Sequence, residues 1–343
     1  MRIKAVAFWM IASFAYAASG QTVDRVFHYA HTEGIQNMQE IATAIRTVGE
    51  IRDVSVDTEQ HTFTVHGTAS QVALAEWLFA GLDQPVPSQP DTATHEYRLP
   101  DGPDNIVRLY NIDHGQSVQD FQEFVTGLRT VLEIRRVFTY NAPRVIVARG
   151  TADQMAIADL LVAELGKRTS GPGPHEVSAE YRLPASPSPG PNENITRVFY
   201  AANSATVQDF QELATLIRAV VNVRRVYTYN AQRAVVVRGN ADQLAFARWL
   251  FDEIDQPATA RTSLESPLYK YQIAGDNDDS ARVFYLVHTS NQSLQETAKA
   301  VRAATKIPRV YVVNAPRALA LRGTGEQLAL AERMIKQLDP ADF

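Results

Sequence analysis

The stretch RVYTYNAQRAVVVRGNADQLAFARWLFDEIDQP, from Arg225 to Pro257, decides the fold. Two runs of β-branched and aromatic residues, 226–229 and 234–237, flank a short polar connection, which predicts a β-hairpin. Gly239 closes the second strand, and the side chain of Asn240 suits the start of a helix. Apolar residues then recur at helical spacing, as Phe246, Ala247, Leu250, Phe251 and Ile254. The stretch therefore predicts strand, turn, strand and an amphipathic helix.

The same pattern is written three more times, starting at Asp53, Arg136 and Arg309. The closing glycines recur about every 85 residues, as Gly67, Gly150, Gly239 and Gly323. Upstream of each hairpin the sequence predicts one more strand and one more amphipathic helix. Each copy is therefore a βαββα unit, and the predicted fold class is α+β, a tandem repeat of four small modules.

The predicted boundaries follow from the copies and from the composition between them. Module 1 covers residues 21–85, module 2 residues 106–167, module 3 residues 195–257 and module 4 residues 281–343. The linkers are 86–105, the Pro/Gly/Ser-rich 168–194, and 258–280. With complete helix caps in each copy, we expect separate folding units and early proteolysis in the second linker.

Each linker also carries a short strand-like phrase, at 96–100, 180–184 and 268–273. Such a strand could extend the sheet of its own module at the edge, or hold on to the previous module. The sequence leaves both alternatives open.

The first 20 residues predict a signal peptide. Arg2 and Lys4 precede an apolar run from Ala5 to Ala17, and Ala15-Tyr16-Ala17 fits the small-x-small cleavage pattern. A membrane anchor is the alternative, but the run is shorter than the ~20 apolar residues that span a bilayer. No later stretch is long and apolar enough. The expected location is periplasmic or secreted, with no membrane span after leader removal.

Charge and cysteine content narrow the function classes. The formal net charge is −5, whereas proteins that bind nucleic acid usually carry a basic excess. No two glycines are three residues apart, so the Gly-x-x-Gly loop of KH-type RNA-binding domains is absent. We therefore expect no nucleic acid as partner. With no cysteine, disulfides, thiol catalysis and thiolate metal sites are excluded.

Motifs for catalysis or cofactors are also missing. There is no Gly-x-Ser-x-Gly, no His-Glu-x-x-His and no phosphate-binding loop. Four of the eight histidines lie in module 1, but His61 and His66 are five apart on one extended strand and point to opposite faces. Residues 276–280 lack the glycine and the final glutamate of a calcium loop. We expect no enzyme activity, no cofactor and no metal.

The order of elements resembles the N-terminal periplasmic domains of secretins, the outer-membrane channels of type II and III secretion and type IV pilus systems. The resemblance lies in the phrase strand–Gly-Thr-x-x-Gln–helix–Leu-Asp, written at 145–165, 235–257 and 319–340. It implies a three-stranded sheet with two helices on one face, and domains that pack around a ring and recruit periplasmic partners. The turn Asn-Ala-Pro-Arg departs from the family pattern. A barrel-forming domain has no counterpart in these 343 residues, so we expect no channel activity.

The candidate interaction face lies on the first strand of each later hairpin. Because side chains alternate along a strand, large residues share one face, namely Arg136, Phe138, Tyr140, Arg225, Tyr227, Tyr229, Arg309 and Tyr311. They could be core residues, or an interaction surface opposite the helices. Arg and Tyr are enriched in binding hot spots, which favours the second. Module 1 has Asp53, Ser55 and Asp57 there and should be dispensable.

These observations predict an exported, non-enzymatic scaffold or protein–protein interaction protein, which could form rings or complexes in a secretion or pilus system. Expected partners are further copies of the chain or other periplasmic secretion or pilus proteins. The alternative is a secreted protein that recognises glycan or cell wall. An enzyme whose site assembles between modules ranks third.

Overall fold

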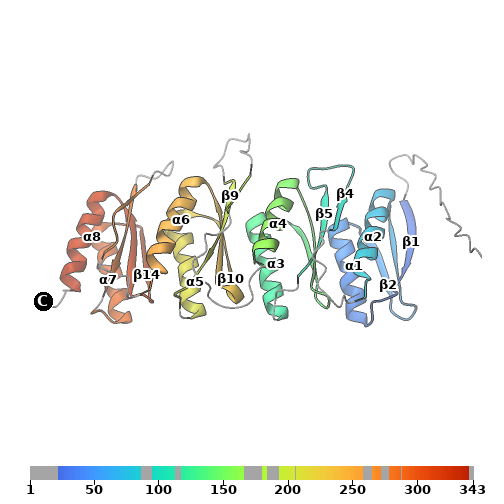
Figure 1. The fold of residues 1–343 in the computed structure, drawn as a ribbon, viewed down its shortest axis with the longest axis horizontal. Helices are drawn as coiled ribbons and strands as arrows, with labels where there is room; N and C mark the ends of the chain where they lie inside the picture. The colour runs from blue at the N-terminus through green and yellow to red at the C-terminus, as the bar shows by residue number, and fades with distance from the viewer. Residues whose placement is uncertain are drawn as a thin grey trace, which may run out of the picture.

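The computed structural model describes residues 22–85, 95–112, 117–165, 180–183, 193–204, 206–257, 265–271, 278–286 and 288–339. The predicted signal peptide and most of the 168–194 linker lie outside these residues. Four antiparallel sheets, each accompanied by two helices, stand in a row from the blue N-terminal end to the red C-terminal end (Figure 1). The fold class is α+β, as predicted.

Module 1 has a three-stranded sheet in the order β1-β3-β2. Its elements are β1 (Thr22–His28), α1 (Ile35–Gly49), β2 (Asp53–Asp57), β3 (Thr62–Thr68) and α2 (Ala69–Leu82). The side chain of Thr68 accepts the backbone N–H of Gln71, and the Gln71 side chain accepts the N–H of Thr68. This reciprocal cap fixes the point at which strand becomes helix.

The later three sheets have four strands, because the linker strand joins each of them. Module 2 contains β4 (His95–Arg98), β5 (Ile106–Asn111), α3 (Val118–Leu132), β6 (Arg136–Tyr140), β7 (Val145–Gly150) and α4 (Ala152–Leu165), in the sheet order β4-β5-β7-β6. The expectation of three strands is therefore wrong for this module. The added strand is held by a charged pair, since Glu96 in β4 accepts from Nη2 of Arg108 in β5 at 2.6 Å.

Modules 3 and 4 repeat this arrangement. Module 3 contains β8 (Glu180–Arg182), β9 (Ile195–Tyr200), α5 (Val207–Leu216), a π-helical turn (Ile217–Asn222), β10 (Arg225–Tyr229), a 3-10 turn (Asn230–Gln232), β11 (Ala234–Gly239) and α6 (Ala241–Ile254). Module 4 contains β12 (Tyr269–Lys270), β13 (Ser280–Tyr285), α7 (Asn291–Thr305), β14 (Arg309–Val313), β15 (Ala318–Gly323) and α8 (Gly325–Leu338). The sheet orders are β8-β9-β11-β10 and β12-β13-β15-β14.

An aspartate at the end of the second helix orients the loop that leads into the first helix. The carboxylate of Asp83 accepts the backbone N–H groups of Ala30 at 2.7 Å and of Thr32 at 2.8 Å. Asp255 and Asp339 make the same kind of contact in modules 3 and 4. Charge-assisted bonds of this kind are strong, so the start of the first helix is tied to the end of the second.

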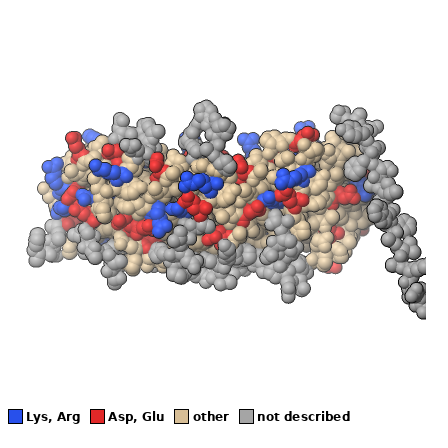
Figure 2. All heavy atoms as spheres, turned by 45° about the horizontal axis from the view of Figure 1, so that its top comes forward, with Lys and Arg blue, Asp and Glu red and all other residues tan. Residues whose placement is uncertain are grey.

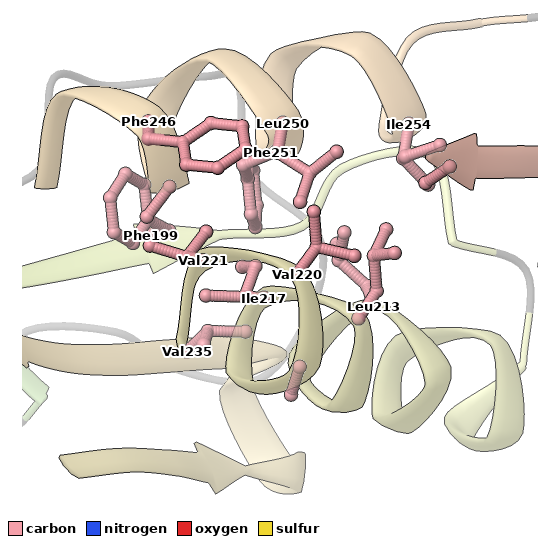
Figure 3. Packing of buried hydrophobic residues seen from close by; sticks show 14 of the residues in the cluster. Phe199, Leu213, Ile217, Val220, Val221, Val235, Phe246, Leu250, Phe251 and Ile254 are labelled. Atoms are coloured by element: carbon pink, nitrogen blue, oxygen red, sulfur yellow. The ribbon is translucent and has the colours of Figure 1, made fainter. Parts of the chain in front are cut away.

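The hydrophobic core continues from one module into the next. One cluster contains Leu250 and Phe246 of module 3 together with Val283 and Ala318 of module 4. Figure 3 shows its module 3 part, where the side chains of α6 meet those of α5 and its π-helical turn. Two further clusters join modules 1 and 2 and modules 2 and 3 in the same way. The expectation of separate folding units disagrees with this shared burial.

Within the described ranges, none of the helices is both long and apolar enough to cross a bilayer.

Candidate functional site

The candidate interaction face is covered by the preceding module of the same chain. Phe138 and Tyr140 of β6 pack in one cluster with α1 residues such as Ile41. Tyr227 and Tyr229 of β10 pack against α3, with the rings of Tyr229 and Phe124 5.9 Å apart. We call each such contact, between the first helix of one module and the sheet of the next, a joint.

Phe138 and Tyr140 lie on the opposite face of the sheet from their own module's helices, as the alternation of side chains predicted. We expected another protein to cover this face, but the preceding module of the same chain covers it. Tyr140, Tyr227 and Tyr229 are buried, and Arg136, Phe138, Arg225, Arg309 and Tyr311 are half-buried. These residues therefore serve contacts within the chain, and those contacts extend the core from module to module.

A glutamate and an asparagine lock each joint at the hairpin turn. Glu40 in α1 accepts the backbone N–H of Asn141 at 2.9 Å and its side-chain N–H at 3.1 Å. Two later pairs repeat both contacts, namely Glu123 with Asn230 and Glu212 with Asn314. Burial raises the pKa of Glu123, and the bonds from Asn230 act in the opposite direction. This pair was not predicted from the sequence, although the glutamate stands at the sixth position of α1, α3 and α5.

Arginines bind the other end of the joint helix. Arg149, which precedes the closing glycine of β7, donates from Nη1 to the carbonyl oxygen of Val48 at 3.1 Å. Two later arginines do the same, as Arg238 to Val131 at 3.3 Å and Arg322 to Val220 at 3.0 Å. The last carbonyls of a helix lack partners within the helix and carry partial negative charge, so an arginine there is doubly favoured. These three arginines were also missed.

Carboxylates complete the same cluster. The residue that ends α1, Glu50, lies in the left-handed region with φ 54° and pairs with Arg136. Glu133 ends α3 in the same conformation, with φ 56°, and accepts from Nη2 of Arg225 at 2.7 Å. That hydrogen bond lowers the pKa of Glu133. Figure 2 shows basic and acidic side chains gathered together at intervals along the length of the molecule.

The residues just before β5, β9 and β13 add a second carboxylate to each cluster. Asp104 pairs with Arg136, and Glu193 with Arg225. In module 4, Asp278 lies 2.8 Å from Nη1 of Arg309 and 3.1 Å from Nε of Arg322. Arg322 has no exposed surface and lies over the ring of Tyr271, 4.8 Å from its centre. The most buried charge of the described chain is therefore paired, stacked and bound to a helix end at once.

The linker strands also contact the previous module. Tyr97 of β4 packs on Trp77 of α2, with ring centres 5.5 Å apart. Tyr269 of β12 stacks on Trp249 of α6 at 4.8 Å and on Phe246 at 5.2 Å. Both alternatives left open by the sequence are therefore realised, because each of these strands extends one sheet and holds the preceding helix.

The histidines of module 1 form no metal-binding group. In the part of the chain that the structure describes, no three metal-ligating side chains come together. His66 is exposed and pairs through Nδ1 with Asp24 at 2.5 Å, while His61 lies in the hairpin turn with φ 53°.

Comparisons with known proteins give matches only among solved structures. No family model matches the chain, and no curated protein does. The chain is similar to ExeD of Aeromonas hydrophila, with 15% identity over 68% of this chain and 41% of that one, at a TM-score of 0.16. It is also similar to the N-terminal domain of the secretin XcpQ from Pseudomonas aeruginosa, with 15% identity over 42% of this chain and 61% of that one, at 0.18.

A further similar structure, described as XcpQN012, has 12% identity over 72% of this chain and 99% of that one, at a TM-score of 0.22. The chain thus spans less than two thirds of the length of the ExeD chain and of the XcpQ N-terminal domain.

Proposed function

We propose that this protein is an exported, non-enzymatic scaffold of the cell envelope, which binds other proteins of a secretion or pilus system. One observation carries the proposal. At all three joints a sheet of one module is buried against the helix of the module before it, so the described modules form one continuous body. Such a body presents a long surface at fixed spacing, as stacked-repeat binding proteins do.

The groups with shifted pKa values support a structural rather than a catalytic use. Burial raises the pKa of Glu123 and of Tyr227, and burial lowers the pKa of Arg238. Perturbed pKa values often mark active sites, but ion-pair networks produce them too. These three groups lie in a joint, in contact with the helix or the strand that they hold in place.

The first helix of each module begins on one long side of the body. We propose that other proteins bind along this side. Ile35, Val118 and Val207 occupy the first position of α1, α3 and α5, and each is at least half exposed. Because these side chains recur once per module at the same helix position, they would present apolar contact points at regular spacing to one extended partner. The corresponding position in module 4 is the polar Asn291.

The test is recovery of partners from cell envelopes. Tagged protein is cross-linked in cells, and the captured proteins are identified by mass spectrometry. We expect secretion or pilus components with the native chain and their loss when Ile35, Val118 and Val207 are all changed to Ser. Asn291→Ser is the matched control and should capture normally. Binding to purified cell-wall sacculi without protein partners would instead support the glycan alternative.

Export is tested separately by N-terminal sequencing of the envelope protein. A start near Ala18 or Gln21 supports it, and an intact Met1 on cytosolic protein contradicts it.

A further inference from the structure

The two ends of the array carry the two unmatched halves of a joint. Among the described residues, no other module covers the outer face of the module 1 sheet or the outer face of α7 in module 4, and these two faces lie at opposite ends of the row (Figure 1). Asp53, Ser55 and Asp57 on β2 are exposed, as are Glu296, Lys299 and Lys306 on and after α7.

We propose that a second copy of the chain docks here, with α7 of one molecule against the β1-β3-β2 sheet of the next. The inference rests on the proposed scaffold function and names one partner for it. It follows from a comparison of the two ends with the three joints inside the chain, position by position.

At the two ends of the array, the charges on the helix and on the sheet are the reverse of those at two of the internal joints. Inside the chain, the residue that ends the joint helix is acidic at Glu50 and Glu133, and it faces Arg136 and Arg225 on the next sheet. At the C-terminal end the same position is Lys306, in the same left-handed conformation with φ 59°. At the N-terminal end, Asp53 stands where the later modules have arginine. In the proposed contact Lys306 would thus meet Asp53, where Glu50 meets Arg136 and Glu133 meets Arg225. At the third joint this helix position is held by the uncharged Asn222.

Further residues make α7 more basic and the module 1 sheet more acidic. Lys299 on α7 stands where the other joint helices carry Thr43, Thr126 and Thr215, beside the strand that it would meet. The open sheet adds Asp57 on β2 and Asp24 on β1, both exposed. Complementary charge of this kind speeds encounter and selects the partner.

The first helix of module 4, α7, also has the glutamate that binds the hairpin turn at the internal joints. Glu296 occupies the position of Glu40, Glu123 and Glu212, whose carboxylates accept the backbone N–H at the next turn. The turn residue of module 1 at that place is Thr58. A backbone N–H is available there whatever the side chain, so Glu296 can make this contact with a second copy.

The apolar part of the end joint is smaller than that of the internal joints. Thr297 and Ala304 replace larger residues such as Ile41 and Val48, and Ser55 replaces Phe138. Association is therefore expected to be weaker than the internal joints and sensitive to salt, because exposed charges are screened by ions.

Because the charges at the two ends are reversed, the end surfaces are disfavoured from pairing with the surfaces of the internal joints. Lys306 would face an arginine if α7 approached an internal sheet, and Glu50 would face Asp53 if α1 approached the open one. Like charges oppose both wrong pairings. Because the two docking surfaces differ, each added copy exposes the same surfaces again, so the contact continues into a chain or closes into a ring.

The test is analytical ultracentrifugation of the purified mature protein over a range of concentration and salt. We expect reversible self-association that weakens as salt rises. Lys306→Glu and Asp53→Arg, made singly, should each weaken it at least about tenfold, since a close charge pair becomes a repulsion. The double variant should restore association, because it recreates the Glu–Arg pair of the internal joints.

Both substitutions suit the fold, since Glu50 and Glu133 already end helices in this conformation and Arg136 already occupies the strand position. Circular dichroism checks this, and Lys270→Glu is the charge control. A native chain that stays monomeric in low salt overturns the proposal. So do single variants that associate as the native chain does. Capture of other envelope proteins is a separate readout, so either result leaves the proposed function to its own test.

Discussion

The hydroxyl of Tyr227 in β10 donates a hydrogen bond to the backbone carbonyl of Glu123 in α3. A side chain of module 3 is thereby bound to the backbone of a helix in module 2. The ring of Tyr227 lies against Gly127, the one position of that helix face without a side chain. Hydrogen bond and ring contact together show that the aromatic residues of the hairpins act at the joints.

Truncation of this tyrosine should weaken the fold. For Tyr227→Ala we expect a loss of about 3–5 kcal/mol in the free energy of unfolding, as for other large buried aromatics. Urea denaturation followed by circular dichroism measures it. Ser55→Ala, at the corresponding exposed position of module 1, should change the value by less than about 0.5 kcal/mol. Similar losses for both variants would mean that the joint adds nothing to stability.

A methyl group at Gly127 should be harmful although alanine favours helices. Its Cβ would overlap the ring of Tyr227, so we expect Gly127→Ala to cost about 1–3 kcal/mol, as overpacking does. In a Tyr227→Ala background the same change should become neutral or stabilising. At the corresponding exposed position of α7, Ala300→Gly should cost only the helix preference, about 1 kcal/mol. A loss at Gly127 that persists without the tyrosine would contradict the clash.

Removal of the buried charge in module 4 should be costly. Arg322→Met leaves Asp278 with fewer partners and frees the carbonyl of Val220, and we expect a loss of about 3–5 kcal/mol in unfolding free energy. Thermal and urea unfolding provide the measurement. His66→Met changes the corresponding residue of the open sheet, where the side chain is exposed, and should have little effect. Equal effects at the two sites would show that the arginine does not stabilise the joint.

The pairing of Glu133 with Arg225 should make one joint sensitive to acid. The hydrogen bond from Arg225 lowers the pKa of Glu133 in the folded chain, below its ordinary value of 4.5. Its stabilisation is therefore complete above pH 4.5 and is lost as the pH falls through the lowered pKa. The melting temperature of the native chain should exceed that of Glu133→Gln at neutral pH, and the two should converge in acid. A difference that stays constant with pH would exclude this pairing as its source.

Much of each module could be predicted from its own sequence. The stretch after Gly239 predicted a helix capped by Asn240, and α6 runs from Ala241 to Ile254 with that cap in place. Alternation placed Tyr227 and Tyr229 opposite the helices of their own module. These features depend on local spacing and on turn chemistry, which a single sequence records.

The joints were harder to predict, because a strand pattern shows that a face is apolar but not what covers it. One available signal was overlooked. The central strands of modules 2 to 4 read VIVARG, AVVVRG and ALALRG, apolar at successive positions, whereas module 1 reads TFTVHGT with alternation. Uninterrupted apolar strands are typical of sheets covered on both faces. The arginine before each closing glycine is harder to recognise, since its partner is a backbone carbonyl in another module.

The direction of the joints has a consequence for the order in which the chain folds. Synthesis releases the N-terminal module first, and domains generally fold in that order. Module 1 folds first, with Asp53, Ser55 and Asp57 on the outer face of its sheet, and the apolar face of α1 stays uncovered until module 2 emerges. Each later module covers the helix left open by the one before it. The first helix of module 4, α7, carries Thr297 and Ala304 where α1 has the larger Ile41 and Val48, so this helix leaves less apolar surface uncovered than the earlier ones do before they are covered.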